Sequence, residues 1–153
     1  MKTNVRLTLA FSLLAATASF AADPQMGTWK LNESKSKFGD GSAKNHTVIH
    51  AAAGKSVKVT VDGTDADGKS THNEWTGKFD GKDYPVTGDP SSDMRSYKKV
   101  DDWTLELSVK KAGKVTATGR IVIAADGKSR TVDTSGTNQK GETVKNTAVY
   151  DKE

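Results

Sequence analysis

The sequence predicts an all-β protein, an antiparallel up-and-down meander of about eight to ten short strands closed into a barrel. Apolar and polar residues alternate along most of the chain, which is typical of strands with one buried face. Gly-Lys pairs, such as those at 54–55, 113–114 and 127–128, separate the alternating runs and mark tight turns. Because the connections are short, consecutive strands should be antiparallel neighbours, and closure would remove the two exposed edges.

The alternating runs and their turn residues define the individual elements. In chain order, the predicted strands span residues 26–31, 44–51, 56–62, 70–76, 83–86, 93–100, 103–110, 115–124, 129–135 and 142–150. Between the first two, residues 32–42 form a polar connection with a short helical turn near residues 34–37.

Alternation also predicts which side chains share a face. In residues 44–51, His46 and His50 are placed on one face, and in residues 56–62 the valines at 57, 59 and 61 face one side. In residues 70–76, Trp75 shares a face with Thr71 and Asn73.

Residues 77–92 are the least regular part of the sequence. They contain Pro85 and Pro90, and proline cannot donate a ladder hydrogen bond, so we expect only a short strand at 83–86. The segment 79–92 is long enough to act as a lid over a binding site.

The second half alternates more cleanly. Asp101 and Asp102 form a two-residue turn before residues 103–110, where Trp103 begins a half-buried strand. In residues 115–124 one face is predicted to carry Val115, Ala117, Gly119, Ile121 and Ile123.

The first 22 residues have the pattern of a secretory signal peptide. Lys2 and Arg6 precede a short apolar run, and small residues allow cleavage after Ala21 or Ala22. We therefore expect one domain at residues 23–153, in a protein that is secreted or periplasmic and does not span a membrane. The sequence has no cysteine, so the core alone must stabilise the fold.

The charge of the chain does not indicate nucleic-acid binding. The net charge is +4, and two of its 23 basic residues, Lys2 and Arg6, belong to the predicted signal peptide. The remaining lysines are scattered over turns and outward strand positions, without the basic stripe and interleaved aromatics of a nucleic-acid-binding surface.

The motif Gly27-Thr28-Trp29 on the first strand, together with the terminal run Thr147-Ala148-Val149-Tyr150, resembles the calycin superfamily of lipocalin-like barrels. The resemblance implies that Trp29 plugs one end of the barrel beneath an arginine from a late strand. Arg130 and Arg120 are both candidates, and Arg130 is preferred because it shares a face with Val132. The chain departs from fatty-acid-binding proteins, whose ligand-gripping arginine near the C-terminus is replaced here by Ala148.

No catalytic, cofactor or metal motif stands out. His46 and His50 are four residues apart on a strand, about 13 Å, which is too far to share one metal ion, and both are expected to be exposed. The loop from Gly63 to Glu74 matches a calcium loop only in part, because its first position is glycine. No nucleophile elbow or phosphate-binding loop is present.

The aromatic residues are the remaining candidates for a site. Trp75, Trp103 and Tyr84 are predicted to lie around the mouth of a pocket, with Thr71 and Asn73 adding polar groups. The predicted function is non-catalytic binding of a small amphipathic or hydrophobic ligand inside the barrel. Two alternatives stay open: a structural or protein-interaction module with a solid barrel, and an enzyme with an internal acid/base pair.

Overall fold

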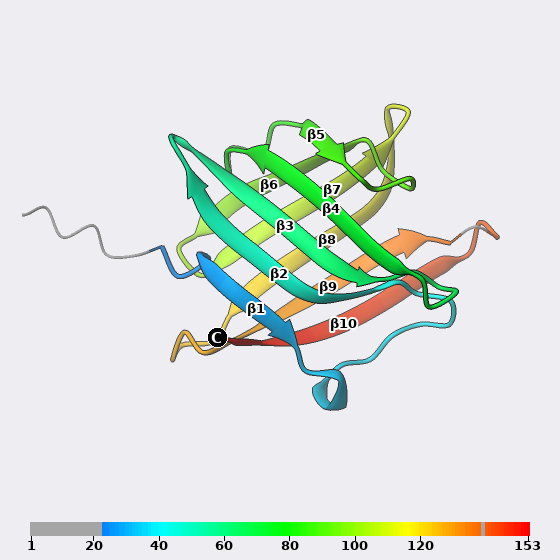
Figure 1. Cartoon of the computed structure of the whole chain (residues 1–153), viewed down its shortest axis with the longest axis horizontal. Helices are drawn as coiled ribbons and strands as arrows, with labels where there is room; N and C mark the ends of the chain where they lie inside the picture. Colours follow the sequence, from blue (N-terminus) through cyan, green and yellow to red (C-terminus); the bar gives the residue numbers. More distant parts are fainter. Residues whose placement is uncertain (1–22, 139) are drawn as a thin grey trace, which may run out of the picture.

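The computed structural model describes residues 23–138 and 140–153, and it is a closed barrel of ten antiparallel strands (Figure 1). The predicted signal peptide, residues 1–22, lies outside the described residues. The helical turn expected near residues 34–37 is a short 3₁₀ helix, η1, at Glu33–Lys35. The predicted all-β meander is therefore confirmed.

Each strand is close to its predicted range. The strands are β1 (Gly27–Leu31), β2 (Lys44–Ala53), β3 (Ser56–Thr64), β4 (Ser70–Gly77), β5 (Tyr84–Thr87), β6 (Met94–Asp101), β7 (Thr104–Lys111), β8 (Lys114–Ile123), β9 (Ser129–Thr137) and β10 (Thr143–Lys152).

The ring closes between the first and last strands. Every strand pairs with its neighbour in sequence, and β1 pairs with β10 through Trp29 opposite Lys152 and Leu31 opposite Tyr150. Beyond η1, Lys37 forms a further bridge to Thr147 of β10. Closure satisfies the backbone groups that an open sheet would leave at its edges.

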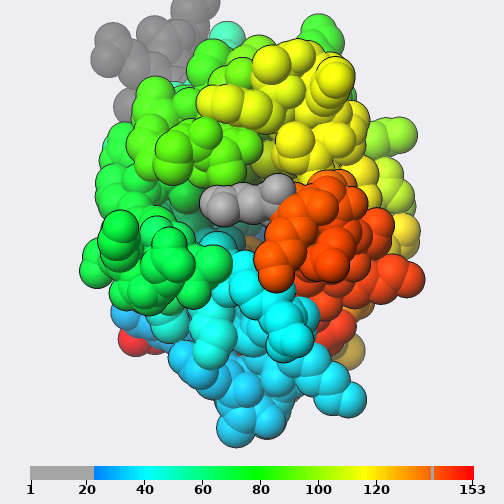
Figure 2. Space-filling model, turned by 90° about the vertical axis from the view of Figure 1, so that its right-hand side faces the viewer, coloured from blue at the N-terminus to red at the C-terminus, as the bar shows by residue number. Residues whose placement is uncertain are grey.

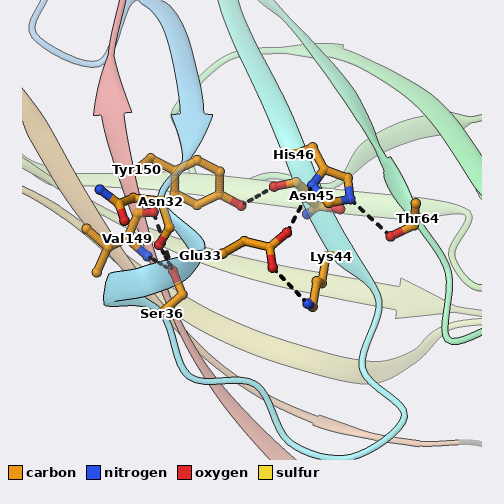
Figure 3. Close-up of polar contacts among 9 residues, drawn as sticks. All are labelled: Asn32, Glu33, Ser36, Lys44, Asn45, His46, Thr64, Val149 and Tyr150. Atoms are coloured by element: carbon orange, nitrogen blue, oxygen red, sulfur yellow. Dashed lines mark hydrogen bonds and ion pairs between the residues drawn. The ribbon is translucent and has the colours of Figure 1, made fainter. Parts of the chain in front are cut away.

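A bulge in β2 changes the predicted placement of two histidines. The register shifts between Asn45 and Thr47, so His46 leaves the alternation and does not share a face with His50. His46 lies near the outer surface, where its ring contacts Thr64 and Glu33 (Figure 3). The expectation of two exposed histidines on one face was wrong, because His50 is only 2% exposed and points into the barrel.

A second register shift changes the predicted face of β8. Ala117 pairs with Val109, but Val115 pairs with Lys110, so Val115 falls on the outer side of the bulge. Val115 is 56% exposed and does not share the inward face of Ala117 as expected.

The two ends of the barrel differ in packing. We call the end with the turns at residues 53–56, 101–104 and 124–128 the closed end, and the opposite end, with the turns at 64–70 and 137–143, the open end (Figure 1).

The buried hydrophobic core comprises Trp29, Val48, Val59, Val61, Trp75, Val86, Tyr97, Leu105, Ile121, Ile123, Ala148 and Tyr150. Tyr150 also donates from its hydroxyl to the carbonyl of Asn45, which ties β10 to β2 across β1 (Figure 3).

Candidate functional site

An arginine–tryptophan stack seals the closed end of the barrel. The guanidinium carbon of Arg130 on β9 lies 4.5 Å from the ring centre of Trp29 and 5.2 Å from that of Tyr150. Trp29 is fully buried, and its indole nitrogen donates to the carbonyl of Gln25. A cation over an indole face is attractive and gains strength when water is excluded.

This sealed end carries buried positive charge. Burial lowers the pKa of Arg130 to about 10, so the group is still charged at neutral pH. Burial first, and then the charges of Arg130, Arg95 and Lys152, hold the pKa of His50 well below its usual value, so its imidazole is neutral. Across residues 23–138 and 140–153, no carboxylate lies within 4.0 Å of Arg130 or Arg95.

Four aromatic rings form the inner wall above this stack. The ring of Trp75 lies 4.8 Å from that of Tyr97, 5.7 Å from that of Tyr84 and 6.3 Å from that of Phe79. Phe79 also packs 6.0 Å from the ring of His50. The segment 79–92, expected as a lid, therefore contributes Phe79 to the core and β5 to the wall.

A buried arginine lies between the aromatic rings and the open end. Arg95 on β6 is 8% exposed, and its backbone carbonyl accepts a hydrogen bond of 2.8 Å from the indole nitrogen of Trp75. Its guanidinium Nη2 donates to the Oδ1 of Asn73 at 3.2 Å. Along β6, Arg95 and Tyr97 are two residues apart and face inward together.

Several inward-facing side chains in the open half of the barrel are partly exposed. We call the inward-facing space of this half the lumen. Its walls include Thr71 of β4, Leu107 and Val109 of β7, Ala117 of β8 and Thr134 of β9, all of which stay partly exposed although they face inward. A side chain added at Gly119 would meet both Leu107 and Thr134, which shows that these two face the same interior. Figure 2 looks onto this end of the barrel.

The structure brings together four of the five predicted ligand-binding residues. Thr71, Asn73 and Trp75 alternate inward along β4, and Tyr84 packs against Trp75. Trp103 is 43% exposed in the turn between β6 and β7 and does not join them. Asp101 accepts from the backbone of Trp103, so this tryptophan belongs to the turn rather than to the strand that was expected to begin with it.

Several interior residues were not singled out from the sequence. Arg95, Tyr97 and His50 face the same interior as Trp75, and Phe79 joins them from a loop. For Arg95 the signal was present, because it alternates with Tyr97 in a predicted strand. For His50 the signal was its alternation with Val48, because the register is unbroken from Thr47 onward; the bulge at residues 45–47 displaces only His46.

A separate groove lies on the outer face of the barrel. It has a volume of about 720 Å³ and runs across β6 to β10. Its outward side chains carry mixed charge, including those of Lys98, Glu106, Arg120, Asp133 and Lys145. Leu107, Gly119 and Thr134 of the lumen wall also border this groove, so the two hollows share strands β7, β8 and β9.

Among the described residues, no helix has the length and apolar character needed to cross a membrane.

Comparison with known proteins identifies the fold. No family model and no curated protein matches the sequence. Among solved structures, the chain is similar to EF1p2_mFAP2b bound to DFHBI, at 14% identity and a TM-score of 0.52, with 87% of this chain and 97% of that chain covered. It is also similar to the redesigned beta barrel mFAP1 bound to DFHBI, at 18% identity and a TM-score of 0.48, covering 86% and 98% of the two chains. The architecture is thus that of a small closed β-barrel.

Proposed function

We propose that this protein binds a small, partly apolar molecule in the lumen and does not transform it. One observation carries the proposal: Leu107, Val109 and Thr134 of the open half remain partly exposed although they face inward, while Trp29, Leu105 and Tyr150 of the closed end are buried. Small barrels commonly either fill their interior with side chains or leave room for one ligand. The buried closed end corresponds to the first arrangement, and the partly exposed inward residues of the open half support the second.

The lining of the lumen favours an amphipathic ligand. Leu107, Val109 and Ala117 supply apolar surface, while Thr71 and Thr134 supply hydroxyl groups. Binding sites for small molecules typically combine an apolar wall with a few placed polar groups. The structural neighbours are described with a bound small molecule, DFHBI, which is compatible with this use of the fold.

An internal acid/base pair has little support. The buried polar residues that the structure describes are Gln25, His50, Asn73, Ser92, Arg95, Ser96, Thr104 and Arg130, a set without Asp or Glu. His50 is held neutral among cationic neighbours, and no carboxylate orients its ring in this part of the chain.

The test is a titration with N-phenyl-1-naphthylamine, a neutral amphipathic dye that becomes fluorescent in apolar surroundings. We expect saturable binding by the purified protein. Thr134→Phe should block the lumen and weaken binding about tenfold or more, because the new ring occupies the space of the ligand. Ser135→Phe is the matched control, since successive side chains of β9 point to opposite faces of the strand.

The outcomes separate the two hollows. Loss of binding in Thr134→Phe alone supports the lumen. Loss in Ser135→Phe alone would place the dye in the outer groove and contradict the proposal, as would the absence of saturable binding in the unmodified protein.

A second candidate function is protein interaction through the outer groove. The observation that favours this candidate is the groove of about 720 Å³, whose neighbouring strands carry opposite charges. Such a surface suits a polar protein partner. Reversing the charge of Lys145, as Lys145→Glu, should then reduce capture of a partner from a periplasmic extract while dye binding in the lumen is unchanged. Equal capture by both proteins would remove this candidate.

We also propose that the barrel belongs to the calycin-like group and works outside the cytoplasm. The support is the Gly27-Thr28-Trp29 motif, the Arg130–Trp29 stack and the pattern of residues 1–22. Expression in a bacterial host should yield periplasmic or secreted protein whose mass corresponds to cleavage after Ala21 or Ala22. An uncleaved cytoplasmic product would contradict the localisation.

A further inference from the structure

We infer that the ligand of the lumen carries an anionic group, a carboxylate, sulfonate or phosphate, and that Arg95 and Asn73 bind this group. The inference rests on the proposed function, because it assigns the chemistry of the molecule that enters the same lumen.

The first support is a buried cation without an anionic partner. Arg95 is 8% exposed, and among the described residues its guanidinium makes one side-chain hydrogen bond, to Asn73. A guanidinium has five N–H donors in a planar fork that matches the two oxygens of a carboxylate or related anion. A buried charge is costly unless it is paired, so a cation left in this state is suited to a partner from outside the chain.

Two carboxylates that precede Arg95 in the chain, Asp89 and Asp93, have hydrogen-bond partners other than Arg95. Asp89 accepts from Ser91 and Ser92, and although burial acts against it, these bonds together with the charge of Arg95 lower the pKa of Asp89. Asp93 uses its Oδ2 to accept from the backbone of Ala112, while its Oδ1 is buried without a hydrogen-bond partner among the described residues. Neither carboxylate lies within the 4.0 Å of an ion pair with Arg95.

Location distinguishes Arg95 from the other buried arginine. Arg130 is covered by Trp29 and Tyr150 at the closed end, where a ligand has no room. Arg95 instead pairs across the sheet with Tyr84 on one side and Val109 on the other, and Val109 is partly exposed in the lumen. An anion at Arg95 would therefore place its apolar portion against Val109, Leu107 and Ala117.

The interior potential favours the same class of ligand. The charges of Arg130, Arg95 and Lys152 all act on His50, and the residues that are buried as a whole include no Asp or Glu; the partly buried Asp89 is the carboxylate whose charge interacts with Arg95. Because the two arginines are at most 8% exposed, their charges attract an anion more strongly than charges on the outer surface would.

The test compares two dyes that share a skeleton and differ in one charged group: 8-anilinonaphthalene-1-sulfonate and neutral N-phenyl-1-naphthylamine. The unmodified protein should bind the sulfonate about tenfold or more tightly than the neutral dye. Arg95→Gln, which retains a donor for Asn73, should lower sulfonate affinity about tenfold or more and change neutral-dye affinity less than about threefold. Arg120→Gln, an exposed arginine beside Glu106, is the matched control and should change neither.

A second variant leaves Arg95 in place. Asn73→Asp puts a carboxylate next to the guanidinium Nη2, so the chain supplies its own anion and competes with the ligand. We expect sulfonate affinity to fall about tenfold or more, with neutral-dye affinity retained and no fall in melting temperature.

Each of the other outcomes contradicts a specific part of the proposal. If both dyes bind equally well, or if Arg95→Gln weakens both to the same extent, the anionic subsite fails while lumen binding stands. If Asn73→Asp leaves sulfonate binding unchanged, Arg95 does not bind the anion. If neither dye binds the unmodified protein, the proposed function fails together with this inference.

Discussion

The closed end and the open half of the barrel use the same alternating strands for different purposes. At the closed end, Trp29, Leu105 and Tyr150 are at most 4% exposed, and Arg130 is covered by two aromatic rings. In the open half, the same inward positions carry smaller or polar side chains, such as Ala117 and Thr134, that solvent still reaches. The inward residues of β8 show the change within one strand, from Ile123 and Ile121 to Gly119 and Ala117.

This difference separates stability from binding. Burial of large apolar side chains supplies most of the free energy of folding, so the closed end should account for most of the stability. A cavity lined by unfilled positions contributes little to folding and leaves room for a ligand. Substitutions in the two halves should therefore have different consequences, and the following predictions compare them.

The largest effect is expected at Trp29. Trp29→Ala removes a fully buried indole, its hydrogen bond to Gln25 and the surface on which Arg130 stacks. We expect a loss of about 3–5 kcal/mol in the free energy of unfolding, measured by urea denaturation. Trp103→Ala is the control and should cost less than about 1 kcal/mol, since Trp103 is 43% exposed. Equal losses would show that the closed end does not dominate stability.

A smaller effect should follow from adding volume at two inward alanines. Ala148→Leu forces three extra carbons into the packed end, where Ala148 is 6% exposed, and should cost about 1–3 kcal/mol. Ala117→Leu places the same side chain in the partly open lumen and should change unfolding by less than about 1 kcal/mol. Thermal and urea unfolding of the pair measure the difference, and similar penalties would contradict an open lumen.

The pH dependence of the free energy of unfolding should reveal the buried imidazole of His50. The pKa of His50 is lower in the folded protein than its ordinary value of 6.5, so the unfolded chain binds a proton more readily. The stabilising contribution of neutral His50 is thus complete above pH 6.5 and is lost as the pH falls below it, with a limiting slope of about 1.4 kcal/mol per pH unit for one proton. Urea unfolding between pH 7.5 and about pH 5 should show this loss, and His50→Gln should remove it.

The exposed His72 provides the opposite case. Its pKa is raised in the folded protein, mainly by the hydrogen bond to Asp62. The stabilising contribution of protonated His72 is therefore present below pH 6.5 and declines as the pH rises through the folded pKa. His72→Gln should leave the acid-side loss due to His50 in place. If His72→Gln rather than His50→Gln abolished that loss, the assignment to the closed end would be wrong.

Much of the fold followed from local pattern. Alternation located every strand to within a few residues, and it placed Thr71, Asn73 and Trp75 on the inward face of β4. It failed at His46 and Val115, because a bulge in β2 and another in β8 each shift the count by one residue. A bulge depends on how a strand meets its partner, so a single run of residues does not reveal it.

The candidate site was less predictable than the fold. Trp103 has the alternation of a strand residue, but the β6–β7 turn includes it and leaves its ring outside. In the sequence, Arg95 cannot be distinguished from the other basic residues of a polar strand. Its burial results from the packing of β4, β5 and β7 around it.

Strand positions, turns and the inward face of most strands come from period-two alternation and turn residues, which act over a few neighbours in the chain. Which end is sealed, which arginine is stacked and which is left facing a hollow depend on residues brought together from β1, β4, β6 and β9. These properties emerge only when the ring closes between β1 and β10, because burial and charge pairing are set by contacts across the interior and not by the order of residues along one strand.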